Sequence, residues 1–200
     1  SQCLSCQAGL FQNEAGASEC SECPRGFFSD AALALVCTEC LEGKYTAVAA
    51  KTDCKECPAG YFETHKIKCE DCPRGWFQAT GGTSVCNECL AGKFSEGIRS
   101  YVCEVCPKGF KEVERVKCDA CPKGRFQKQT GNTTCHSCQE GEFSNDIASS
   151  SCADCPAGWE DTDEKSRCDS CTKGRFQKQS KQSNCLECLP GSVSLELSAI

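Results

Sequence analysis

The chain has 200 residues, a formal net charge of −6 and 24 cysteines. Leu, Ile, Val and Phe together contribute only 32 residues, which is too few for a conventional apolar core. The acidic charge argues against nucleic acid as a partner, and no apolar run is long enough to cross a membrane.

All the cysteines lie in twelve Cys-x-x-Cys pairs, from Cys3/Cys6 to Cys185/Cys188, and most pairs are 17 residues apart. Such regular spacing indicates tandem repeats, which we treat as a single array over residues 1–200. A glycine stands three residues after every pair, and an aromatic residue follows it two places later in most units. Proline follows six of the pairs, so each unit is expected to open with a tight turn that leads into a short strand.

In chain order, the pattern predicts a short strand at each aromatic residue and another before the next cysteine pair. The fold class expected is a small disulfide-rich array of about twelve 15–17-residue units. These units are mostly coil with short β-hairpins, almost without helix, and form an elongated rod. Residues 31–36 are the only segment with a helical pattern.

A longer period of about 49 residues is superimposed on the period of about 17 residues between cysteine pairs. Phe-Gln units (LFQNEAGASE, WFQATGGTSV, RFQKQTGNTT, RFQKQSKQSN) are followed by apolar units (FFSDAALALV, KFSEGIRSYV, EFSNDIASSS, SVSLELSAI). Short charged units complete the set (YFETHKIK, FKEVERVK, WEDTDEKSR), and KYTAVAAKTD is an additional unit. The super-repeats are 54–102, 103–151 and 152–200, with 1–53 as an irregular N-terminal group. The period predicts three recurring environments, or records the duplication of a three-unit block.

The consensus Cys-Pro-x-Gly-x-Phe, with CPRGFFSDAALALVC and CPKGRFQKQTGNTTC as its clearest copies, resembles the ephrin-receptor-like cysteine-rich repeats. It is more loosely similar to the small loop of tumour-necrosis-factor-receptor modules. The resemblance covers essentially the whole chain, although several units lack the proline. It specifies the type of repeat rather than a function, since such repeats occur in receptors, secreted matrix proteins and surface proteins.

Two regular disulfide schemes are compatible with the sequence. In the ladder scheme, which resembles the small receptor loop, the second cysteine of each pair bonds the first of the next. In the interlaced scheme, Cys3 bonds Cys20 and Cys6 bonds Cys23, and the pattern restarts at Cys37. We favour the ladder because interlacing uses two pairs at a time and conflicts with a period of three. The ladder pairs Cys6 with Cys20, Cys23 with Cys37, Cys40 with Cys54, Cys57 with Cys69, Cys72 with Cys86, Cys89 with Cys103, Cys106 with Cys118, Cys121 with Cys135, Cys138 with Cys152, Cys155 with Cys168, and Cys171 with Cys185.

The ladder leaves Cys3 and Cys188 for bonds to other units or molecules.

Zinc binding is the main alternative to disulfide bonding, because two Cys-x-x-Cys pairs can supply four thiolates. The continuous repeat pattern argues against zinc, and twelve equivalent pairs argue against a redox enzyme. We expect neither a cofactor nor catalysis. His65 and His136 fit surface positions, and the acidic loop at Asp161, Asp163 and Glu164 lacks a complete calcium pattern.

Disulfides persist in oxidising compartments, so we expect a secreted or cell-surface protein, and its start within a unit suggests part of a longer one. The favoured function is an extracellular rod or filament segment for assembly or adhesion, with a ligand-binding receptor ectodomain as the alternative.

Expected partners are further copies or other extracellular proteins. Glycans are another option, through basic residues of the Phe-Gln units such as Lys123, Arg125, Lys173 and Arg175. Asn132 begins a glycosylation sequon. Candidate assembly contacts are Leu33, Leu35, Ile98, Tyr101, Val102, Ile147, Leu195 and Leu197.

Overall fold

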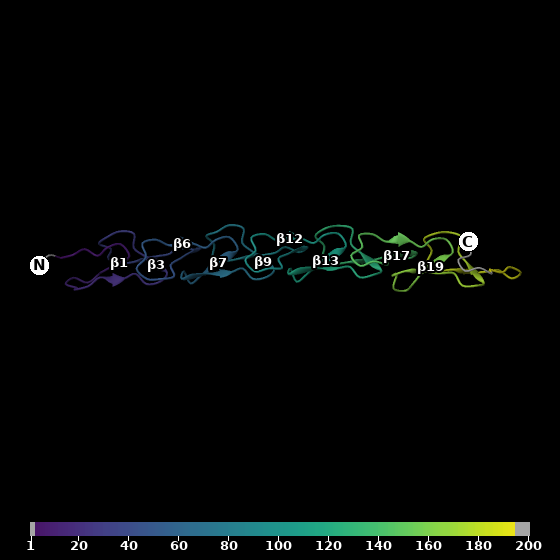
Figure 1. The fold of residues 1–200 in the computed structure, drawn as a ribbon, viewed down its shortest axis with the longest axis horizontal. Helices are drawn as coiled ribbons and strands as arrows, with labels where there is room; N and C mark the ends of the chain where they lie inside the picture. Colours follow the sequence, from purple (N-terminus) through teal and green to yellow (C-terminus); the bar gives the residue numbers. More distant parts are fainter. Residues whose placement is uncertain (1–2, 195–200) are drawn as a thin grey trace. The chain divides into compact units, whose positions relative to one another are not determined.

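The computed structural model describes residues 3–194 (Figure 1). Within this range, 22 short strands form eleven antiparallel two-stranded hairpins, each strand pairing with its neighbour in sequence, and there is no helix. The expected fold of short hairpins is confirmed. The strands are β1 Leu10–Phe11, β2 Ser21–Glu22, β3 Phe27–Phe28, β4 Thr38–Glu39, β5 Lys44–Tyr45, β6 Lys55–Glu56, β7 Tyr61–Thr64, β8 Lys68–Asp71, β9 Trp76–Phe77, β10 Asn87–Glu88, β11 Lys93–Phe94, β12 Glu104–Val105, β13 Phe110–Val113, β14 Lys117–Ala120, β15 Arg125–Phe126, β16 His136–Ser137, β17 Glu142–Phe143, β18 Ala153–Asp154, β19 Trp159–Asp161, β20 Cys168–Ser170, β21 Arg175–Phe176 and β22 Leu186–Glu187.

Eleven disulfides join the second cysteine of one pair to the first of the next, which is the ladder arrangement. Each closes one hairpin, and we number the repeats by these bonds. The bonds are Cys6–Cys20 (repeat 1), Cys23–Cys37 (2), Cys40–Cys54 (3), Cys57–Cys69 (4), Cys72–Cys86 (5), Cys89–Cys103 (6), Cys106–Cys118 (7), Cys121–Cys135 (8), Cys138–Cys152 (9), Cys155–Cys168 (10) and Cys171–Cys185 (11).

Each repeat opens with a tight turn, as repeat 5 illustrates. The N–H of Trp76 donates to the carbonyl of Pro73 over 3.1 Å, and Gly75 has a φ of 79°. A positive φ at the third residue of a four-residue turn is the type II geometry, which favours glycine. The turn directs the chain into β9, whose Phe77 lies opposite Asn87 of β10.

The buried apolar residues of the described chain are all cysteines. They are Cys6, Cys23, Cys40, Cys57, Cys72, Cys89, Cys106, Cys121, Cys138, Cys155, Cys171 and Cys185. The aromatic residue of each hairpin is only partly buried. Disulfides therefore occupy the centre of each repeat, in place of the aliphatic side chains that fill the interior of an ordinary domain. Closing a loop of about 15 residues contributes ~3 kcal/mol in the chain-entropy model.

The chain divides into two compact units. The first contains the residues up to Cys89 together with Ser95–Cys103, and the second contains Leu90–Phe94 and the residues from Glu104 onward. The contacts described below lie within one unit or the other, and the same kinds of contact recur in both.

Residues 31–36 do not form the helix that their pattern indicated. They make turns and bends, and Leu33 has a φ of 65°. The N–H of Leu33 donates instead to the carbonyl of Cys6 in the preceding repeat, over 2.9 Å. The helix prediction was wrong because the backbone of this loop bonds to a neighbouring repeat and not to itself.

Candidate functional site

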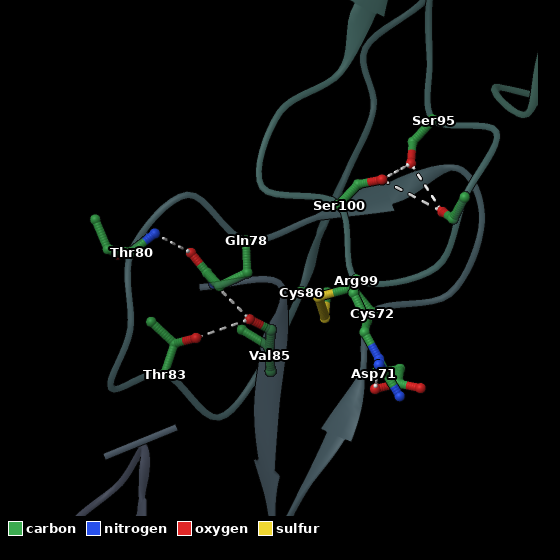
Figure 2. The surroundings of a disulfide bond; sticks show 11 residues. Asp71, Cys72, Gln78, Thr80, Thr83, Val85, Cys86, Ser95, Arg99 and Ser100 are labelled. Atoms are coloured by element: carbon green, nitrogen blue, oxygen red, sulfur yellow. Dashed lines mark hydrogen bonds and ion pairs between the residues drawn. A yellow bond between two sulfur atoms is a disulfide. The ribbon is translucent and has the colours of Figure 1, made fainter. Parts of the chain in front are cut away.

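Backbone hydrogen bonds join consecutive repeats. Between repeats 5 and 6 in the first unit, the N–H of Gly75 donates to Ser95, the N–H of Gln78 to Ser100, and the N–H of Arg99 back to Cys72, each over 2.9 Å. Figure 2 shows the side chains of Gln78, Ser95, Arg99 and Ser100 around the Cys72–Cys86 disulfide. Each repeat thus provides both donors and acceptors that position the next one.

The second unit repeats this arrangement with different side chains. Between repeats 8 and 9, Gly124 donates to Ser144, Gln127 to Ser149, and Ala148 back to Cys121, over 2.8–3.0 Å. Because the bonds use main-chain atoms, they tolerate variation in loop sequence. This explains how repeats with such different loops can stack in the same way.

The invariant glycine contacts the repeat two places ahead. A Cβ placed on Gly60 of repeat 4 would lie 2.3 Å from the carbonyl oxygen of Arg99 in repeat 6. In the second unit, a Cβ on Gly109 of repeat 7 would lie 1.9 Å from the oxygen of Ala148 in repeat 9. These distances leave no room for a side chain, and both glycines also have positive φ. At Gly60 and Gly109, backbone conformation and crowding therefore both require glycine.

The residue three places after the glycine distinguishes the three classes of repeat. In Phe-Gln repeats it is a glutamine, whose side chain forms hydrogen bonds with the main chain of its own loop. Gln78 donates from Nε2 to the carbonyl of Val85 over 2.7 Å, and its Oε1 accepts from the N–H of Thr80 over 3.4 Å (Figure 2). Gln127 makes the equivalent bonds over 2.7 and 3.0 Å and is almost completely buried. The glutamine therefore holds the loop between the two strands.

In apolar repeats the same position is serine. Ser95 donates to the carbonyl of Gly97 over 3.1 Å and lies hydrogen-bonded to Ser100, as Figure 2 shows. Ser144 makes the corresponding bonds to Asp146, over 3.2 Å, and to Ser149, over 2.7 Å. The serine thus bonds only to polar groups of its own loop, and the apolar side chains Ile98 and Ile147 of these loops are exposed.

In the short repeats the position is acidic, and in repeats 7 and 10 its carboxylate accepts the hydrogen bond that a main-chain carbonyl accepts elsewhere. Glu112 of repeat 7 accepts from Arg115 in its own turn, over 2.5 Å, and from Gly92 of repeat 6, over 3.3 Å. Asp161 of repeat 10 accepts from Gly141 of repeat 9 over 2.9 Å. Each acid thus binds the glycine of an apolar repeat immediately before it.

In repeat 3, which contains the additional segment KYTAVAAKTD, a threonine accepts the hydrogen bond from the glycine of the repeat before. Thr46 Oγ1 accepts from the N–H of Gly26, in apolar repeat 2, over 2.7 Å. Three kinds of hydrogen bonding therefore recur in order along the chain.

Ion pairs reinforce the contacts between repeats two places apart. Arg99 lies 2.7 Å from Asp71 and 5.3 Å from the ring centre of Tyr61, both at the hairpin of repeat 4. Lys66 lies 2.9 Å from Glu39, and Lys181 lies 2.5 Å from Glu142. The hydrogen bond from Lys181 lowers the pKa of the Glu142 carboxyl below its ordinary value. These basic residues share one feature, a left-handed backbone at the loop position facing the earlier glycine.

The candidate assembly residues are exposed apolar side chains. Leu33 is 70% exposed, Ile147 is 65% exposed, and Leu35, Ile98, Tyr101 and Val102 are also more than half exposed. Leu33 and Leu35 line one open hollow with Leu4 and Cys3 in the first unit. Ile98, Tyr101 and Val102 share the loop of repeat 6, and Ile147 lies in the loop of repeat 9. Leu195 and Leu197 lie outside the described residues.

Cys3 and Cys188 are the cysteines of the described chain that carry no disulfide. All others are in bonds between successive pairs, so their sulfurs are not thiolates that could bind zinc. No group of three or more His, Cys, Asp or Glu side chains in residues 3–194 is arranged to hold a metal. His136 is exposed, with its ring centre 6.0 Å from that of Phe126.

The basic residues of the Phe-Gln repeats lie among acids. Lys123 and Arg125 share an open hollow with Asp163 and Glu164, and Arg175 lies 3.8 Å from Glu160. These acids reduce the attraction that the basic groups would exert on an anionic glycan.

The hydrogen-bonding role of the residue three places after the glycine was not predicted from the sequence. A detectable signal was present, because this position is polar in all twelve units. Its residues are Gln12, Ser29, Thr46, Glu63, Gln78, Ser95, Glu112, Gln127, Ser144, Asp161, Gln177 and Ser194. A polar position beside a half-buried aromatic residue indicates an internal hydrogen-bonding role.

Across the part of the chain that the structure describes, no helix has the length and apolar character needed to cross a membrane. No curated protein matches the sequence. The sequence model of the family described as "Tyrosine-protein kinase ephrin type A/B receptor-like" matches residues 1–35, 26–67, 60–101 and 129–166, which together exceed half of the chain. These matches and the eleven disulfide-closed repeats confirm the resemblance seen in the cysteine pattern. The chain belongs to the ephrin-receptor-like family of cysteine-rich repeats.

Proposed function

We propose that this chain is an extracellular structural segment, a stiff rod or filament-forming part of a secreted or surface protein. The observation that carries the proposal is the same set of bonds joining repeat to repeat within both compact units. Covalent closure of each repeat, together with these bonds, leaves few freely rotating links inside a unit. The disulfides and the family both favour an extracellular location.

The proposed assembly surface consists of the exposed apolar loops of the apolar repeats, represented by Leu33 and Leu35 and by Ile98 and Val102. Single exposed apolar residues are common, but their recurrence in one class of loop is unusual. The serine hydrogen bonds in these repeats hold the loop without using any apolar side chain. Contacts at the apolar side chains therefore need not disturb the fold.

Sedimentation velocity over a range of concentrations, on the chain secreted with its disulfides intact, tests this proposal. We expect the parent chain to self-associate. The pairs Leu33→Ser/Leu35→Ser and Ile98→Ser/Val102→Ser should weaken association while circular dichroism stays unchanged. Leu90→Ser is the matched control, because Leu90 is equally exposed but lies in a turn.

Self-association of the two loop variants at the parent level would remove the assembly surface. A parent chain that stays monomeric at every concentration, yet captures one extracellular protein at a fixed ratio, would replace the proposal with the alternative. That alternative is a ligand-binding receptor ectodomain, for which the family gives precedent.

A further inference from the structure

The loop of repeat 8 contains Asn132-Thr133-Thr134, between β15 and β16. The pattern Asn-x-Thr is the acceptor for N-linked oligosaccharide in the secretory pathway. We propose that Asn132 is N-glycosylated and that it is the single such site in the described chain. The inference rests on the extracellular location and is independent of self-association.

This segment contributes to the fold through its main chain, and Asn132 itself is partly exposed. The carbonyl of Asn132 accepts from the N–H of Glu112 over 2.8 Å. The side-chain Nδ2 has one long bond, 3.4 Å to the carbonyl of Thr130. A bond of that length contributes little, so attaching a sugar at Nδ2 sacrifices no strong interaction.

The threonine of the sequon is also free to take part in recognition. Thr133 and Thr134 are exposed. Thr134 contributes to the fold through its carbonyl, which accepts from Gln127 Nε2 over 2.7 Å. Replacement of the Thr134 side chain should therefore remove the acceptor signal without loosening the loop.

The proposed step is a group transfer from a polyprenyl-pyrophosphate-linked oligosaccharide. A bond forms between Asn132 Nδ2 and C1 of the first sugar, and the bond from C1 to the phosphate oxygen breaks. The amide loses one proton, and the polyprenyl pyrophosphate leaves with the bonding electrons. The second amide hydrogen remains on Nδ2.

The structure also accounts for a single site. Asn87-Glu88-Cys89 is the weaker candidate, but Cys89 is buried and bonded to Cys103. The loops equivalent to that of repeat 8 carry Thr83 in repeat 5 and Gln182 in repeat 11 at the position of Asn132. A glycan on Asn132 would stand near Val105, because Gly131 lies against that half-exposed side chain.

The test is expression through the secretory pathway of animal cells, followed by intact-mass measurement before and after peptide N-glycosidase. We expect the mass of one N-glycan on the parent chain, removed by the enzyme and absent from Asn132→Gln and Thr134→Ala. The double variant Thr83→Asn/Val85→Thr places the same sequon in the equivalent loop of repeat 5. It should carry two glycans, or one when combined with Asn132→Gln.

An unmodified parent chain overturns the proposal, whether or not the transplanted sequon is occupied. A glycan that persists in Asn132→Gln overturns the claim of a single site. Sedimentation of the Asn132→Gln chain separates this proposal from the assembly proposal, because self-association should not require the glycan.

Discussion

The Glu112 carboxylate joins two repeats, because it accepts from the N–H of Arg115 in its own turn and from the N–H of Gly92 in the repeat before. Replacing it with alanine leaves both donors without this partner. We expect Glu112→Ala to lower the free energy of unfolding by about 1–3 kcal/mol. Hydrogen exchange should accelerate at Gly92 and Arg115 in particular. Glu96→Ala, at an exposed loop position, is the control, and equal exchange in both variants would contradict the bridging role.

Three glycine variants separate backbone strain from crowding. Gly97→Ala should be nearly neutral, because Gly97 has neither a positive φ nor a neighbour near its Cβ position. Gly16→Ala should cost about 1 kcal/mol, because Gly16 has a φ of 80° but open space around it. Gly60→Ala should cost about 3 kcal/mol or more, because it adds a clash with the Arg99 carbonyl. Urea unfolding of the three variants checks this order, and equal losses for Gly16→Ala and Gly60→Ala would contradict the packing between repeats.

The Glu142–Lys181 pair makes stability depend on pH in acid. The folded-state pKa of Glu142 lies below its ordinary value of 4.5, first because of the hydrogen bond from Lys181. Its contribution is therefore fully present above about pH 4.5 and is lost as the pH falls through the folded-state pKa. Lys165 acts in the same direction, and Asp154 also faces Lys181.

Lys181→Gln should raise the Glu142 pKa toward its ordinary value and make unfolding less sensitive to pH in this range. A carboxyl-detected NMR titration of Glu142 measures the shift directly. An unchanged titration midpoint in Lys181→Gln would show that the ion pair does not form in solution.

The order of the repeat classes can be tested by deletion. Removing residues 103–151 joins repeat 6 to repeat 10, so an apolar repeat is still followed by a short one. Cys89 then meets Cys152 in place of Cys103. Removing residues 103–117 instead places Phe-Gln repeat 8 after repeat 6, and Gly92 loses its carboxylate partner. We expect the longer deletion to be secreted with complete disulfides and the shorter one to show lower yield and faster exchange at Gly92. Equal behaviour would mean that the class order has no structural role.

The cysteine spacing and the constant glycine predicted the repeat, its hairpin and its opening turn, because those features depend on a few local residues. The roles of Gln78, Ser95 and Glu112 were not predicted. Their partners come from loops whose paths depend on neighbouring repeats. Leu33 and Ala148 were equally unexpected, because both have positive φ where glycine or asparagine is usual. Contacts with neighbouring repeats position these residues, so local propensity alone could not identify them.

The measurement that most directly tests the account is disulfide mapping of the secreted chain by mass spectrometry, after alkylation of free thiols and digestion without reduction. The account predicts linked peptides that join successive pairs, such as Cys72 to Cys86 and Cys121 to Cys135, and no bond between those pairs in any other order. Peptides that join Cys3 to Cys20, or Cys37 to Cys54, would show the interlaced scheme. That result would contradict the repeat structure on which the proposed structural function depends.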